Sequence, residues 1–135
     1  MSYQNMINYP HAYYLKYFLG KQINCFIWNY KGYGRTRGTP DPREFSTDAE
    51  QILNYLRLVI GIKGKIGVYG RSLGCIPATH ISKYVDMIIA DRGFCDLWTL
   101  ADKKFYSDVA IPLIKYGTGG WQAQNAYNML KIPNK

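Results

Sequence analysis

The stretch from Lys65 to Ala78 places the narrowest limits on what this chain can fold into. It reads KIGVYGRSLGCIPA, in which an apolar run meets the pentapeptide G-x-S-x-G and continues into small, helix-compatible residues. A turn from a strand into a helix over one residue strains the serine backbone and brings the two backbones close together, and the flanking glycines relieve that crowding. The stretch therefore predicts a strand over 65–69, a tight turn at Ser72 and a helix over 73–83.

Ser72 is the candidate nucleophile in this turn. A serine hydroxyl is a weak nucleophile on its own, so it requires a base, a group that stabilises the oxyanion and an exposed position. The turn supplies the exposure, and the first N–H groups of the following helix, including that of Leu73, would face a developing negative charge. The alternative interpretation is an ordinary turn in which two glycines happen to flank a serine.

Strands and helices alternate along the chain. Apolar, aromatic and β-branched residues predict strands over 23–28 and 85–90, in addition to the strand over 65–69. This alternation predicts an α/β fold with about three parallel strands and helices on both faces of the sheet. Because functional loops follow the carboxyl ends of parallel strands, we expect Ser72, Asp91 and a glycine-rich loop after residue 28 to share one edge.

Helices are predicted from apolar residues at helical spacing. One is expected over 12–19, closed by Gly20, and another from Asp41 to Ile60, with Asp41 as N-cap and Pro42 at the first position. The remaining predicted helices cover 96–105 and 121–130.

The glycine-rich segment Asn29–Pro40 nearly matches a dinucleotide-binding fingerprint. The spacing of Gly32, Gly34 and Gly38 is one residue too long, however, and prolines follow where a phosphate-binding helix should already be running. A tight surface loop is therefore favoured, and no cofactor is expected.

The composition fits one globular domain over residues 1–135, with 47% hydrophobic and 16% aromatic residues. Seventeen Lys and Arg against nine Asp and Glu give a net charge of +8. The basic residues are spread along the sequence, and the densest group is Lys31, Arg35 and Arg37. A generally basic surface is favoured over a dedicated nucleic-acid face, although a basic nucleotide or nucleic-acid binder stays open as an alternative.

The cysteines Cys25, Cys75 and Cys95 lack CxxC or Cys/His spacing and lie in or beside apolar segments. They are interpreted as reduced, buried thiols and not as a disulfide framework or a metal site. The N-terminal sequence has no basic and apolar leader, and no run is long enough to span a membrane. A cytoplasmic protein is expected, with peripheral membrane association left open.

Four blocks in this order resemble the α/β-hydrolase family, and within it the serine-aminopeptidase-like and ABHD-like serine hydrolases. The blocks are WNYKGYGRTRGTP (28–40), DAEQILNYL (48–56), KIGVYGRSLG (65–74) and VDMIIADRGFCDL (85–97). The resemblance covers the middle of the family's domain and implies a partial, truncated α/β-hydrolase fold.

The resemblance also implies which parts of the family domain are absent. Residues 23–28, 65–69 and 85–90 correspond to the fourth, fifth and sixth strands, and residues 131–133 resemble the beginning of the seventh. No segment corresponds to the third strand or to the oxyanion loop that follows it. The usual acid and histidine follow the seventh and eighth strands, past Lys135.

Candidates for the missing partners are few. His80 lies eight residues after Ser72 on the same predicted helix, about 12 Å along its axis, which argues against contact with the serine hydroxyl. His11 precedes the first predicted helix, and the sequence does not place it relative to Ser72. Asp91 follows the strand beside the serine turn, where some family members carry the acid, although a loop-fixing aspartate is the favoured alternative.

The resemblance implies a serine hydrolase that acts on a small acyl-bearing substrate, an ester, thioester or amide, by acyl transfer. Ser72 is the expected nucleophile, the Leu73 N–H the expected oxyanion donor and Asp91 the candidate acid, without a metal or other cofactor. The alternatives are a catalytically inactive family member with a binding role and the basic nucleotide or nucleic-acid binder. Because the usual acid and histidine are missing, we expect this chain alone to be inactive.

Overall fold

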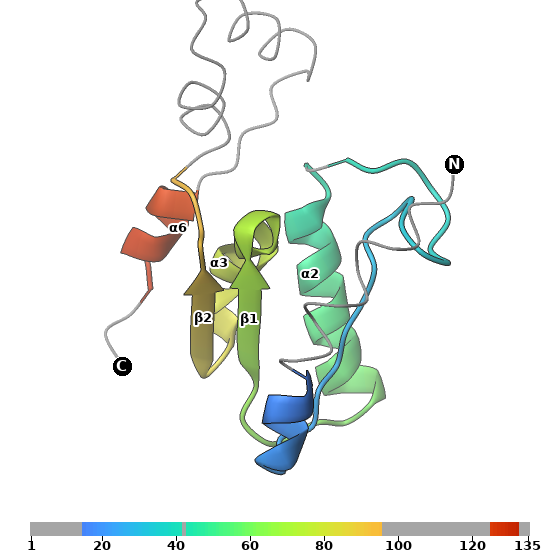
Figure 1. Cartoon of the computed structure of the whole chain (residues 1–135), viewed down its shortest axis with the longest axis vertical. Helices are drawn as coiled ribbons and strands as arrows, with labels where there is room; N and C mark the ends of the chain where they lie inside the picture. Colours follow the sequence, from blue (N-terminus) through green and yellow to red (C-terminus); the bar gives the residue numbers. More distant parts are fainter. Residues whose placement is uncertain (1–14, 42, 96–124, 133–135) are drawn as a thin grey trace, which may run out of the picture. The chain divides into compact units, whose positions relative to one another are not determined.

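The computed structural model describes residues 15–41, 43–95 and 125–132. The chain divides into two units, Met1–Asp41 and Pro42–Lys135. The second unit contains the sheet and the serine turn (Figure 1). The helix predicted over 96–105 lies outside the described residues.

The sheet of the second unit has two parallel strands, β1 (Gly67–Arg71) and β2 (Met87–Asp91) (Figure 1). Their register pairs Gly67 with Met87 and Arg71 with Asp91, so the two strands end level with each other. Parallel pairing confirms the α/β class, whereas the described residues contain two strands and not three. Both strands lie one or two residues later in the sequence than predicted.

The later start of the strands follows from the residue pair that precedes them, Ile66 and Asp86. The Ile66 N–H donates to the Asp86 side chain at 2.9 Å, and the Asp86 N–H donates to the Ile66 carbonyl at 2.8 Å. A side chain therefore replaces one backbone partner here, and the regular ladder begins one residue further along.

The segment between the strands is not one helix over 73–83. It consists of the 3-10 turn η2 (Ser72–Gly74), the α-helix α3 (Cys75–His80) and a second 3-10 turn, η3 (Ser82–Tyr84). Pro77 lies in the first turn of α3, where its missing N–H costs no helical hydrogen bond. The α-helix ends at His80, and the carbonyl of its C-cap residue, Ile81, accepts from the Tyr84 N–H at 2.9 Å in the tighter 3-10 pattern.

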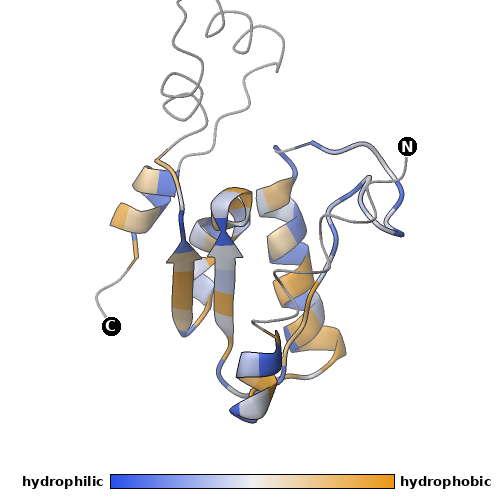
Figure 2. Cartoon of the chain, in the orientation of Figure 1, coloured by the Kyte–Doolittle hydropathy of each residue, from blue (hydrophilic) through white to orange (hydrophobic). Residues whose placement is uncertain are grey.

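Helix α2 (Phe45–Asn54) continues into a π-helical turn, η1 (Tyr55–Val59). The predicted N-cap at Asp41 is wrong, because Glu44 is the N-cap residue and its carbonyl accepts the Asp48 N–H at 2.8 Å. Pro42, predicted at the first helical position, lies outside the described residues. The predicted apolar face is buried in its first half, but Ile60 at its end is 54% exposed. Figure 2 shows hydrophobic residues gathered at this end of α2 and in η1.

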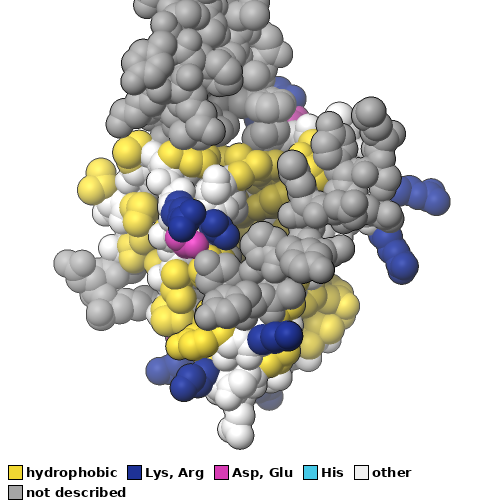
Figure 3. Space-filling model, viewed as in Figure 1, with side chains coloured by type: hydrophobic (Ala, Val, Ile, Leu, Met, Phe, Trp, Pro, Cys, Tyr) yellow, Lys and Arg dark blue, Asp and Glu magenta, His cyan; other side chains and the backbone are white. Residues whose placement is uncertain are grey.

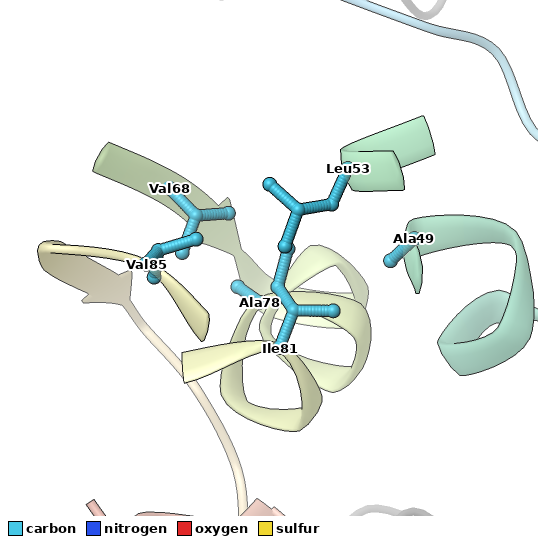
Figure 4. Close-up of a cluster of buried hydrophobic side chains, with 6 residues drawn as sticks. All are labelled: Ala49, Leu53, Val68, Ala78, Ile81 and Val85. Atoms are coloured by element: carbon cyan, nitrogen blue, oxygen red, sulfur yellow. The ribbon is translucent and has the colours of Figure 1, made fainter. Parts of the chain in front are cut away.

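The core of the second unit joins α2, β1 and α3 (Figure 4). Short helix α3 packs against α2, β1, β2 and α6 (Asn125–Leu130). Small residues let the backbones approach, and branched residues fill the space between them. The core residues are Ala49, Leu53, Val68, Ala78, Ile81 and Val85.

Asn125, which is 2% exposed, connects helix α6 to the rest of the second unit by hydrogen bonds. Its Nδ2 donates to the Phe94 carbonyl at 3.0 Å, and its Oδ1 accepts from the Thr79 hydroxyl at 3.0 Å. The next N–H, from Ala126, donates to the Cys95 carbonyl at 3.2 Å. A buried amide with both ends satisfied therefore links α6, α3 and the segment after β2.

In the first unit, residues 15–20 are helical, which confirms this part of the helix predicted over 12–19. Gly20 does not close it. Gln22 takes the left-handed conformation, with a φ of 59°, and donates to the Leu19 carbonyl, while the Ile23 N–H donates to the Phe18 carbonyl. These two bonds form a Schellman ending, with glutamine at the position that usually holds glycine.

The strand predicted over 23–28 does not form in the structure. A buried strand requires a hydrogen-bonded neighbour and a covering layer, whereas Ile23, Phe26 and Ile27 are each about half exposed, at 49%, 49% and 48%. The prediction failed because hydrophobic composition alone does not supply a pairing partner.

Candidate active site

Ser72 lies at the point where β1 ends and η2 begins. Its φ is 52°, in the left-handed region that non-glycine residues rarely adopt, and its side chain is exposed. The sharp strand-to-helix turn expected from the sequence is therefore present. Leu73 follows as the second residue of η2, where an N–H group has no partner within the turn itself.

The turn is sterically possible because residue 70 is glycine. A Cβ placed on Gly70 would collide with the Gly74 carbonyl oxygen and would lie 2.7 Å from the Ala78 Cβ, closer than side chains approach. Gly74 itself has an ordinary right-handed φ of −64°. The close approach expected at both glycines is thus shown at Gly70, whose missing side chain makes room for the backbone of Gly74.

Asp91 lies directly opposite Arg71 in the strand register, so it is level with the end of β1 beside Ser72. Its Oδ2 accepts a hydrogen bond from the Tyr69 hydroxyl at 2.8 Å and lies 3.6 Å from Arg71 Nε, while its Oδ1 lies 3.9 Å from Arg92 Nε. Asp91 therefore holds the strand ends together, and this carboxylate already has hydroxyl and guanidinium partners.

Cys75 is packed beneath the serine turn and is 1% exposed. Its thiol donates to the Gly70 carbonyl at 3.1 Å and lies 3.7 Å from the Asp91 carbonyl oxygen, so it touches the ends of both strands. Burial, followed by the nearby Asp91 charge, raises the pKa of this thiol. The predicted burial is confirmed for Cys75 and is wrong for Cys25 and Cys95, which are free and exposed.

The two histidines do not complete a triad in the described structure. His80 Nε2 lies 2.8 Å from Glu50 Oε1, so His80 pairs with a carboxylate of α2. His11 lies outside the described residues. Tyr69, Arg71 and Arg92 were not singled out from the sequence, although level parallel strands would have placed them around Asp91.

The glycine-rich loop of the first unit closes on itself. The Gly32 N–H donates to the Thr36 carbonyl, and the Thr36 N–H donates to the Tyr33 carbonyl, each at 3.0 Å. A Cβ on Gly32 would lie 2.8 Å from Pro40 Cγ. The Gly32 and Thr36 N–H groups are thus engaged within the loop, in agreement with the tight surface loop expected there.

Two further features of the described residues bear on function. In that part of the chain, no group of three or more His, Cys, Asp or Glu residues is arranged to hold a metal ion. None of the described helices has the length and apolar character needed to cross a bilayer.

Comparison with known proteins shows what the sequence of the chain is similar to. The chain is a partial match to the α/β-hydrolase domain proteins, as the sequence blocks indicated. No family model and no solved structure matches the chain.

Three relatives illustrate the match. Human alpha/beta hydrolase domain-containing protein 17B is 34% identical over 67 residues, 47% of this chain and 23% of that protein. Protein bem46 of Schizosaccharomyces pombe is 37% identical over 114 residues, 81% of this chain and 38% of that protein. A Saccharomyces cerevisiae relative, named an uncharacterized membrane protein, is 36% identical over 80 residues, 56% of this chain and 28% of that protein. The matched region therefore spans well under half the length of each of these relatives.

Proposed function

We propose that this chain carries the nucleophile of a serine hydrolase of the α/β-hydrolase type. The observation that carries the proposal is the backbone of Ser72, a non-glycine residue with a φ of 52° that is exposed at the end of β1. Strained residues of this kind cluster at functional sites because the surrounding structure must hold them in place. The similarity to α/β-hydrolase domain proteins supports the same role.

The proposed reaction is acyl transfer from an ester, thioester or amide. Ser72 Oγ attacks the carbonyl carbon and its proton passes to a base, while the carbonyl oxygen becomes an oxyanion that the Leu73 N–H stabilises. The acyl–serine bond is then hydrolysed by water. Asp91 is the candidate acid of this site, because it ends β2 level with the serine turn.

Ser72 has no histidine beside it among the described residues. The one histidine of the described residues, His80, pairs with Glu50, and a base beside Asp91 would compete with Tyr69 for Oδ2. This observation favours a second candidate function, a family member that presents the serine turn without turnover and acts by binding.

A fluorophosphonate probe tests the nucleophile directly, because one attack by Ser72 labels the protein even when turnover is absent. We expect labelling of the wild-type chain that disappears in Ser72→Ala. The matched control is Ser46→Ala, which removes a partly buried serine of α2 and should label like wild type. Equal labelling of wild type and Ser72→Ala would refute the nucleophile, and no labelling of either would favour the binding role.

Turnover is a separate measurement. Removing triad members from serine hydrolases leaves about 10³ to 10⁴ of rate enhancement, supplied by the oxyanion site and substrate binding. With one oxyanion donor proposed here, less should remain. The 135-residue chain should hydrolyse a short-chain nitrophenyl ester no faster than Ser72→Ala. Clear Ser72-dependent turnover would contradict this and would mean that a base reaches the serine.

A further inference from the structure

Arg92 is the counterpart of Ser72 at the end of the neighbouring strand. Arg71 pairs with Asp91 in the register, and the residue after each has a positive φ, 52° for Ser72 and 53° for Arg92. Two adjacent parallel strands thus end side by side in left-handed, non-glycine residues.

The conformation of Arg92 has no helix ending to explain it. Gln22 also has a positive φ, but there the left-handed residue completes the hydrogen bonds that end a helix. Arg92 follows a strand, and an arginine gains nothing from the left-handed region that glycine or asparagine would not gain at lower cost. Backbone preference therefore does not explain an arginine at position 92, which points to a role for its side chain.

Among the described residues, the charges at the strand ends leave one positive charge in excess. Asp91 supplies one negative charge to two guanidinium groups, those of Arg71 and Arg92. The Arg71 side chain is 31% exposed and its Nε lies 3.6 Å from Oδ2, an oxygen that already accepts from Tyr69. Figure 3 shows acidic and basic side chains together on this face of the molecule.

Arg92 is the guanidinium that remains accessible. Its side chain is 77% exposed, and the 3.9 Å separation from Asp91 Oδ1 is too long for a hydrogen bond. An arginine fork binds a carboxylate through two parallel N–H bonds, and such charge-assisted pairs are stronger than neutral ones. Arg92 therefore lies beside Asp91 at the strand end while its N–H donors form no hydrogen bond with that carboxylate.

We propose that Arg92 binds a carboxylate group carried by the acyl substrate at the Ser72 site, so that the site selects anionic acyl compounds. The inference rests on the proposed function, because Ser72 defines where the acyl carbon lies. Arg92 would then determine specificity by fixing the charged end of the substrate, while the chemistry takes place at the end of β1.

The test measures binding in the Ser72→Ala chain, so it does not depend on a reactive serine. Monoethyl succinate carries an ester and a carboxylate, and diethyl succinate replaces that carboxylate with a second ester. Titrations followed by NMR should show binding of the monoester about twofold to fivefold tighter than of the diester, the upper part of the range expected for an exposed ion pair. The preference should vanish when Arg92→Ala is added.

Three further variants separate charge from conformation. Arg92→Gly relaxes the left-handed backbone and should lose the preference as Arg92→Ala does. Arg92→Lys keeps the charge and should retain part of it. Arg35→Ala removes an exposed arginine of the first unit and should retain all of it.

Two outcomes would overturn the inference. One is equal affinity of the two esters, which includes the case in which neither binds. The other is a preference that Arg35→Ala and Arg92→Ala reduce equally. A failed fluorophosphonate experiment with a retained anion preference would refute the nucleophile and leave the Arg92 site standing. Labelling of Ser72 without an anion preference would do the opposite.

Discussion

Replacing Gly70 with alanine should destabilise the second unit more than adding one methyl group at an exposed position of that unit. The added Cβ would meet the Gly74 carbonyl oxygen and would lie 2.7 Å from both the Gly74 carbonyl carbon and the Ala78 Cβ. Two of these atoms belong to the backbone, so the start of α3 must move. Overpacking of this kind costs about 1 to 3 kcal/mol where side chains can adjust. With backbone in the way, we expect about 2 to 4 kcal/mol.

Thermal and urea unfolding followed by circular dichroism would measure this cost. At about 4 °C per kcal/mol, the melting temperature should fall by about 8 to 16 °C. The matched control is Gly64→Ala, where nothing lies within 4 Å of the added Cβ and stability should stay level or rise. Adding Ala78→Gly to Gly70→Ala removes one of the clashes and should recover part of the loss. Equal stability of Gly70→Ala and Gly64→Ala would refute the steric account of the turn.

Three other outcomes follow from the described contacts. Asn125→Leu should lower the free energy of unfolding by about 1 to 3 kcal/mol, since the Phe94 carbonyl loses its partner while the Thr79 hydroxyl still reaches the Cys75 carbonyl; an unchanged urea midpoint would contradict this. Gln22→Gly should stabilise the helix ending by about 0.5 to 1 kcal/mol, because glycine adopts a φ of 59° without strain, and a loss of stability would count against the Schellman assignment. Iodoacetamide at pH 8 should modify Cys25 and Cys95 well before Cys75, whose burial and raised pKa leave less thiolate at a given pH; mass spectrometry showing equal rates would disprove this.

The serine turn was predictable because several local requirements coincide in one short stretch. A β-rich run, two glycines and helix-compatible residues can satisfy one another only in a strand-to-helix turn. The sequence therefore located Ser72 correctly at the end of a strand, together with the parallel partner that ends at Asp91. It erred on the boundaries, since the Asp86 side chain that displaces the ladder acts across twenty residues.

The surroundings of the turn were less predictable, because they depend on register and not on local pattern. Tyr69 and Arg71 reach Asp91 only because β1 and β2 end level with each other. The segment over 23–28 shows the opposite error, a strand that was predicted and does not form. It has strand-like composition, yet composition does not determine whether a neighbouring strand exists to pair with it.

The burial of helix α3 affects which substitutions can alter the geometry of this site during evolution. Five of its six residues are buried, on a helix with less than two full turns. Because nearly all of this helix is in contact with other elements, its orientation is determined by its packing against α2, α6 and both strands. Substitutions that shift Ser72 by a fraction of an ångström should therefore arise most readily in those neighbours, at positions that never touch a substrate.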